Sequence, residues 1–206
     1  MWVAYVPEKG FRFLSPFEAG FRSMTTKEPL NTPADAKGKK LRSFPNEMMR
    51  WQLEAMGFNV QIMPLPEVYL AIQQGAVSGQ ENPIDTIHAN KFYEVAPNVT
   101  LTQHVYSPIP LTISEKTWQK LSPADREAVT RAAKEAADWS RKEVSGNDDR
   151  QLKEMESKGA KIARPNIGPW REVVKPVYEQ AKAKYGADVD AILADAAEVR
   201  KAVPAK

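Results

Sequence analysis

Two short polar runs hold the side chains best suited to bind a small anion. Arg42 follows Leu41 at the end of an expected strand, and Asn82 closes the run Gly79–Asn82 just before Pro83. A guanidinium offers a rigid fork of donors that matches a carboxylate, and a carboxamide donates and accepts hydrogen bonds at once. Because ligands of open α/β sheets lie at the carboxyl ends of the strands, these positions predict the binding of an organic acid.

Each of these residues also has a purely structural interpretation. Arg42 fits a surface arginine that caps a neighbouring helix. Asn82 fits the N-cap of a helix that Pro83 opens, and that helix N-terminus adds partial positive charge suited to an anion. The capping and binding roles of Asn82 are compatible with one another.

Strands alternate with helices over the middle of the chain, which predicts an α/β lobe with a mostly parallel sheet. Gly57 and Gly75 end two of the helices, and Pro66 and Pro83 begin two. The expected strands are 40–43, 59–63, a short one after Val77, 99–102 and 110–113, and the expected helices are 45–56, 66–75 and 83–91.

The last third of the chain is expected to be helical. Ser122 and Pro123 mark a helix start, and an apolar stripe continues the helix to Met155, with Gly146–Asp148 as a bend. A short strand over 160–163 and helices over 169–185 and 188–202 follow. The tryptophans of these helices, expected to pack inward, are Trp118, Trp139 and Trp170.

Composition and motifs exclude several classes of protein. The net charge of +3 gives no strong field for nucleic acid, the absence of cysteine excludes disulfides, and the run Met1–Glu8 lacks the features of a secretion signal. No apolar run approaches the ~20 residues of a membrane helix. Nucleophile-elbow, phosphate-loop, zinc and dinucleotide motifs are absent.

A metal or other cofactor is not expected either. His88 and His104 are the only histidines, so a metal site would need mainly carboxylates. Glu81 and Asp85 lie four residues apart and fit one helix face, but that spacing arises often by chance.

The order of three motifs resembles the solute-binding proteins of tripartite ATP-independent periplasmic (TRAP) transporters, the DctP-like family. Arg42 is followed by Met63–Tyr69 (MPLPEVY) and then by Gly79–Pro83 (GQENP), and the resemblance extends from about Phe21 to Lys184. The family more often has Asp where Ser78 stands. The resemblance implies ligand capture rather than catalysis.

The resemblance also implies roles for five residues. Arg42 would clamp the ligand carboxylate and Asn82 would hydrogen-bond the ligand. Arg22 would touch the ligand or brace the clamp. Leu65 stands where many members carry a stacking aromatic, so it would give apolar contact only. His104 would lie near the cleft floor and hold water, although a lone histidine is more often structural. Glu67 and Tyr69 fit capping and helix-face positions.

By the same resemblance, the fold is α/β and like a type II periplasmic binding protein, with one lobe, long C-terminal helices and part of the other lobe missing. We expect residues 1–36, rich in exposed phenylalanines, to complete that N-terminal lobe, residues 37–113 to form the ligand-binding lobe, and residues 114–206 to pack across both. The expected function is a periplasmic component that delivers an organic acid to TRAP membrane subunits. The alternatives are a truncated, non-binding remnant or scaffold, and a carboxylate-dependent enzyme acting on organic acids.

Overall fold

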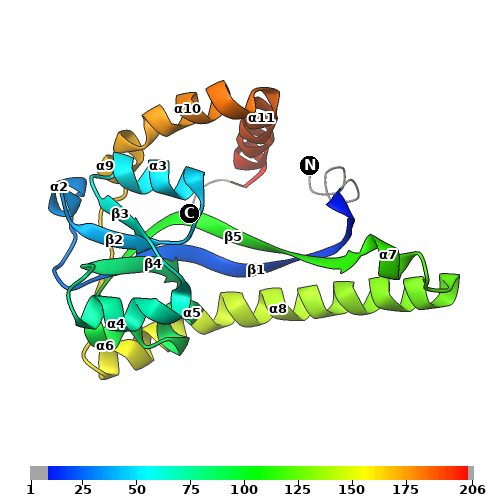
Figure 1. Ribbon diagram of the computed structural model, residues 1–206, viewed down its shortest axis with the longest axis horizontal. Coiled ribbons are helices and arrows are strands. Elements are labelled where there is room, and N and C mark those ends of the chain that lie inside the picture. The colour runs from blue at the N-terminus through cyan, green and yellow to red at the C-terminus, as the bar shows by residue number, and fades with distance from the viewer. Residues whose placement is uncertain (1–8, 204–206) are drawn as a thin grey trace.

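A mixed six-stranded sheet forms the centre of the protein, which we describe from a computed structural model over residues 9–203 (Figure 1). The strand order across the sheet is β3-β2-β4-β1-β5-β6. The strands are β1 (Phe11–Thr26), β2 (Lys40–Ser43), β3 (Asn59–Ile62), β4 (Gly79–Pro83), β5 (Asn98–Ser114) and β6 (Lys161–Ala163). The N-terminal run Met1–Glu8, in which no secretion signal is expected, lies outside the described residues.

The strand directions agree with the expected mostly parallel sheet in three of its five pairings, and β1 is the exception. β2 runs parallel to β3 and β4, and β5 runs parallel to β6. β1, however, lies antiparallel to both β4 and β5. The two short strands expected at 99–102 and 110–113 are parts of the single long strand β5. Periodicity could not reveal this, because β1 and β5 pair across about 70 residues or more of intervening chain.

Helices cover both faces of the sheet (Figure 1). One apolar core includes Met24, Leu41 and Trp170 and packs α3, α2 and α9 against the sheet. The other includes Ile72, Phe92 and Met155 and packs α4, α5, α6 and α8 on the opposite face. The helices are α2 (Pro33–Ala36), α3 (Glu47–Ala55), the 3-10 turn η2 (Leu65–Glu67), α4 (Val68–Gln73), α5 (Ile84–Ala89), α6 (Phe92–Val95), α7 (Glu115–Trp118), α8 (Pro123–Ser157), α9 (Gly168–Val173), α10 (Lys175–Tyr185) and α11 (Ala187–Ala202).

The helix signals in the sequence are largely confirmed. Gly57 takes a left-handed φ of 105° just after α3, where a side chain would be strained. The Ser122 side chain accepts a hydrogen bond from the Asp125 amide, and Pro123 begins α8. That helix runs unbroken for 35 residues through the expected bend at Gly146.

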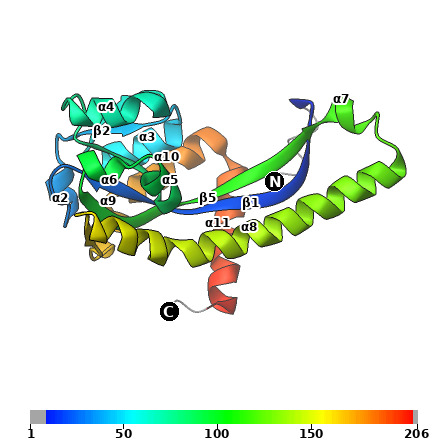
Figure 2. The same cartoon turned by 90° about the horizontal axis from the view of Figure 1, so that it is seen from below.

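Beyond the sheet, β1 and β5 continue as a two-stranded ribbon, with α8 running beside it (Figure 2). At its tip Arg12 forms a bidentate pair with Glu115 and lies over the ring of Trp118. β1 is thus a central strand of this sheet as well as one half of the ribbon. The division of the chain at residue 36 remains a prediction.

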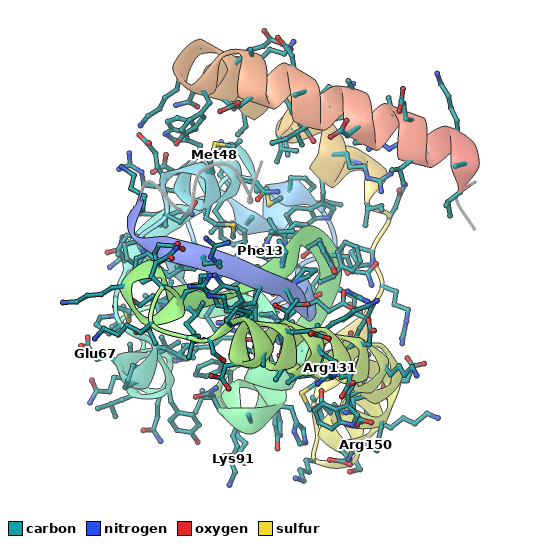
Figure 3. The ribbon with its side chains drawn as sticks, turned by 90° about the vertical axis from the view of Figure 1, so that its right-hand side faces the viewer. Phe13, Met48, Glu67, Lys91, Arg131 and Arg150 are labelled. Atoms are coloured by element: carbon teal, nitrogen blue, oxygen red, sulfur yellow. The ribbon has the colours of Figure 1, made fainter. Side chains whose placement is uncertain are left out.

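The C-terminal helices form a separate layer beyond α3. Figure 3 shows this layering, with Met48 on the α3 side and Arg150 on α8 at the opposite side of the sheet. α11 buries no residue and projects from the body (Figure 2). Across residues 9–203, no helix has the length and apolar character needed to cross a membrane.

Candidate functional site

Polar side chains are buried where β2 and β4 approach their carboxyl ends. The strand register places Arg42, Gln80 and Thr25 at neighbouring positions, so these side chains share one face of the sheet. Met24 pairs with Glu81, which places Glu81 on the other face. A sheet interior is normally apolar, so this cluster needs a reason other than packing.

Arg22 is held by Glu81. Its Nη2 donates to Oε1 and to the backbone oxygen of Glu81, both at 2.9 Å, while its Nε donates to Oε2. Its guanidinium also lies 5.0 Å from the centre of the Phe44 ring. The Glu81 side chain is fully buried, so this is an interior ion pair in which the positive charge of Arg22 is neutralised within the protein.

His104 approaches the same carboxylate from β5. Its Nε2 lies 3.4 Å from Oε2 of Glu81, an ion-pair distance rather than a well-formed hydrogen bond, and its Nδ1 lies 2.8 Å from the Thr102 hydroxyl. Gln103, with a left-handed φ of 46°, sits in a β5 bulge opposite Arg22 and Met24. Burial alone would raise the pKa of Glu81, but His104 and Arg22 outweigh it and hold that pKa below its usual value.

Arg42 has no such partner. Its Nε and Nη2 donate to the backbone oxygen of Met63 at 3.0 and 2.9 Å. No carboxylate forms an ion pair with it among residues 9–203, although the residue is only 3% exposed. Burial is the main cause that lowers the pKa of this guanidinium, opposed by Glu81 and assisted by Arg22. The structural interpretation of Arg42 as a surface helix cap is wrong.

Asn82 lies in β4 and does not cap α5. The N-cap of α5 is Pro83, which has extended backbone and receives no side-chain cap, so the N-cap interpretation of Asn82 is wrong. Its Oδ1 accepts a hydrogen bond from Arg22 Nη2 at 3.0 Å, and its Nδ2 donates to Gln80 Oε1. Gln80 in turn donates to the Thr25 hydroxyl at 2.9 Å.

The motif Met63–Tyr69, which precedes β4, supports the site by holding Arg42 and by packing against the core. Leu65 opens η2, two residues after the Met63 oxygen that holds Arg42, and packs its half-buried side chain against the core. The Tyr69 hydroxyl donates to Glu94, so Tyr69 is a helix-face residue as expected. Glu67 stands at the N-cap position of α4, as expected, but its exposed side chain makes no capping hydrogen bond.

A hollow of about 500 Å³ opens on the Arg22 side of the sheet. Of the five predicted residues, Arg22 alone lines it. Its other walls come from α3, β5 and α10, and they are Phe44, Asn46, Met48, Met49, Gln52, Val105, Tyr106, Ser107, Pro108, Val174, Val177 and Tyr178.

The structure thus joins Arg22 and His104 through Glu81, links Asn82 to Arg22, and places Arg42 on β2, the strand on the other side of β4 from Arg22. Glu81 is not among the five predicted site residues, because the sequence offers only its spacing to Asp85, which fits one helix face. Glu81 is in fact on β4 and Asp85 on α5. One signal in the sequence points to Glu81. It is one of several consecutive polar side chains in the run Gly79–Pro83, which is expected to form a short strand.

The chemistry of this cluster is that of anion recognition. Within residues 9–203, no group of three or more His, Asp or Glu side chains is arranged to hold a metal ion. The cluster instead offers a buried cation, an oriented amide and a neutralised ion pair.

Comparisons with known proteins agree on one family. Residues 2–184 match the family DctP, described as bacterial extracellular solute-binding protein, family 7. The sialic acid-binding periplasmic protein SiaP of Vibrio cholerae is 35% identical over 185 residues, which cover 89% of this chain and 57% of SiaP.

Solved structures extend the comparison to the fold. A TRAP periplasmic solute-binding protein of a Polaromonas species, bound to D-erythronate, has a TM-score of 0.86 and 34% identity, covering 97% of this chain and 64% of that one. A Sulfitobacter protein of the same kind, with bound β-D-galacturonate, has a TM-score of 0.85 and 33% identity over 89% of this chain and 62% of its own. The chain therefore spans about three fifths of the proteins that it matches here.

Proposed function

We propose that this chain, which belongs to the DctP family of bacterial extracellular solute-binding proteins, forms the acid-recognising part of a TRAP-type solute-binding protein. Its ligand would be a small organic acid. The membership is a property of the chain, whereas the ligand, the partners and the cellular compartment are proposals.

The observation that carries the proposal is the unpaired charge of Arg42. Burying a cation without an anion is costly, and proteins normally pair such a charge. The Met63 oxygen satisfies Nε and one hydrogen of Nη2, but it brings no negative charge. A ligand carboxylate would supply that charge and take up donors that remain on the guanidinium.

The other predicted residues have distinct parts in this proposal. Asn82 would hydrogen-bond the ligand beside Arg42, on the same face of the sheet. Leu65, close in sequence to the Met63 oxygen that holds Arg42, would give apolar contact. Arg22 and His104 are held by Glu81, so their proposed role is to brace the site through Asn82.

For the longer protein we propose the role typical of TRAP systems. The ligand would bind between two lobes, and closure would create the shape that the membrane subunits recognise in the periplasm. Residues 37–113 would supply one wall of the cleft, residues 1–36 would connect it to the other wall, and residues 114–206 would pack across both.

A titration with matched ligands tests the proposal. D-galacturonate and D-erythronate should bind to the longer protein that supplies both walls of the cleft, with D-galactose as the control that lacks the carboxylate. Calorimetry should show acid binding that Arg42→Ala weakens by about 2–5 kcal/mol. Equal binding of D-galactose would contradict it, absence of binding would favour a scaffold, and chemical conversion of a bound acid, followed by NMR, would favour an enzyme.

A further inference from the structure

A series of three hydrogen bonds links four side chains from Arg22 into the sheet. Arg22 Nη2 donates to Asn82 Oδ1, Asn82 Nδ2 donates to Gln80 Oε1, and Gln80 Nε2 donates to the Thr25 hydroxyl. Gln80 is fully buried and Asn82 is 7% exposed. No binding role is predicted for Gln80, so the proposed function leaves the burial of this polar side chain unexplained.

Donors and acceptors can be arranged along this series of hydrogen bonds in only one way. A guanidinium has donors and no acceptor, so the atom of Asn82 that faces Arg22 has to be the oxygen. The amide nitrogen of Asn82 then faces Gln80, whose own oxygen has to accept. Gln80 Nε2 is left facing Thr25, and a hydroxyl can accept that bond. Turning either amide around would bring donor against donor or acceptor against acceptor.

We propose that Gln80 is a positioning residue that fixes the amide of Asn82 so that an N–H, and not the carbonyl oxygen, is left for the ligand. The second hydrogen of Asn82 Nδ2 has no partner among the described residues. The consequence rests on the proposed function: beside Arg42, the site selects ligand oxygens that accept hydrogen bonds and rejects groups that only donate, such as an ammonium.

Glu81 makes this arrangement rigid. The two-pronged pair between Arg22 and Glu81 prevents Arg22 from turning away, and the Ser43 hydroxyl donates to the same carboxylate at 3.3 Å. Asn82 is therefore held between a fixed donor on one side and a buried acceptor on the other. Side chains locked in this way are those that hold a ligand group in a precise position.

The first test uses no ligand. In a ¹⁵N–¹H NMR spectrum of the whole chain, one Asn82 amide proton should be shifted and protected by its bond to Gln80, and its partner should not. Gln80→Leu should remove this difference, whereas Gln119→Leu, the same change at the C-cap of α7 at the far end of the ribbon, should leave it intact. An Asn82 signal unchanged by Gln80→Leu would overturn the proposal.

The second test measures affinity for D-galacturonate in a double-mutant cycle. Gln80→Leu should weaken binding about tenfold, because a buried donor of Asn82 loses its partner and its orientation. In an Asn82→Ala background the same change should have no further effect. Equal losses in both backgrounds would show that Gln80 acts through packing alone and would overturn the proposal.

Two precautions keep the outcome decisive. Gln80→Met, with an unbranched side chain, replaces Gln80→Leu if thermal melting shows that the latter does not fold. Failure of the longer wild-type protein, with both walls of the cleft, to bind any acid would count against the proposed function, whereas the NMR comparison decides the orientation of Asn82 by itself.

Discussion

Arg22 on β1 and Arg42 on β2 are both buried, and each lies on a strand that pairs with β4. They differ in the group that neutralises their charge. Arg22 is paired with Glu81, whose carboxylate also meets His104 and Ser43. Among residues 9–203, the hydrogen bonds of the Arg42 guanidinium go to the backbone oxygen of Met63 alone. The two arginines therefore differ in environment: Arg22 is neutralised within the protein, whereas Arg42 has no carboxylate paired with it in this part of the chain, as our proposal of an external anion requires.

The difference predicts opposite effects of substitution. Removing a member of a compensated buried pair leaves its partner as an uncompensated charge, which is destabilising. Removing a charge that has no partner costs little stability but removes whatever that charge was placed to bind. The predictions below test this contrast in order of decreasing effect.

The largest effect is expected for Arg22→Ala. The change leaves the fully buried Glu81 without its main partner, so the free energy of unfolding should fall by about 3–5 kcal/mol. Urea denaturation measures this loss. The double variant Arg22→Met with Glu81→Leu removes both charges and should recover most of the stability. A loss below about 1 kcal/mol for the single variant would place Arg22 among weak surface pairs.

Arg42→Ala should instead weaken ligand binding. Its affinity for D-galacturonate should fall by about 2–5 kcal/mol, as for truncating one partner of a buried charge pair, while the free energy of unfolding changes little. Arg42→Lys should restore only part of the affinity, since an ammonium lacks the planar fork. Calorimetry that found Arg42→Ala within about twofold of the wild type would rule out the clamp.

Asn82→Asp should give a smaller loss of affinity. The new carboxylate repels an anionic ligand and removes the donor that Gln80 orients, so binding should weaken by about tenfold. Stability should change little, because the charge gained beside Arg22 offsets the bond lost to Gln80. A fall in stability without a fall in affinity would make Asn82 a structural residue only.

The sequence was sufficient where the signal is local. Arg42 at a strand end, the Ser122 cap and the left-handed Gly57 each depend on a few neighbouring residues. Trp118 and Trp170 are buried as expected, but Trp139 is 65% exposed, because α8 turns that side away from the sheet. The helical stripe alone did not indicate which residues would face outward.

The errors arise where the cause is distant in sequence. The helix-cap alternative for Asn82 fails because β4 extends to Pro83, further than the sequence predicts. Glu81 was missed because its partners come from β1 and β5, and the pairing of those strands is not visible in local periodicity. The family motif could be recognised from the sequence, but the ion pair that neutralises Arg22 and leaves Arg42 without a carboxylate partner among the described residues required the tertiary structure.

Asp148, for which residues 9–203 provide no ion pair, extends the contrast to an anion and gives the smallest expected effect. Burial between α8 and the sheet, with Asp85 and Asp149 nearby, raises the pKa of Asp148 from 3.8 to about 6. A carboxyl with a raised folded pKa binds more protons in the folded than in the unfolded state, so stability falls as the pH rises from about 4 to about 6.

Asp148→Asn carries no such charge. It should therefore be more stable than the wild type by about 1 kcal/mol at pH 8, a value reduced from the full linkage because the group is half exposed. At pH 3.5, where the wild-type carboxyl is largely protonated in both states, the difference should vanish. Thermal or urea unfolding across this range measures it, and Asp138→Asn, on an exposed turn of the same helix, is the matched control. An Asp148→Asn variant that was less stable at every pH would show that the carboxylate has a favourable partner, and the rule drawn from Arg22 and Arg42 would not extend to it.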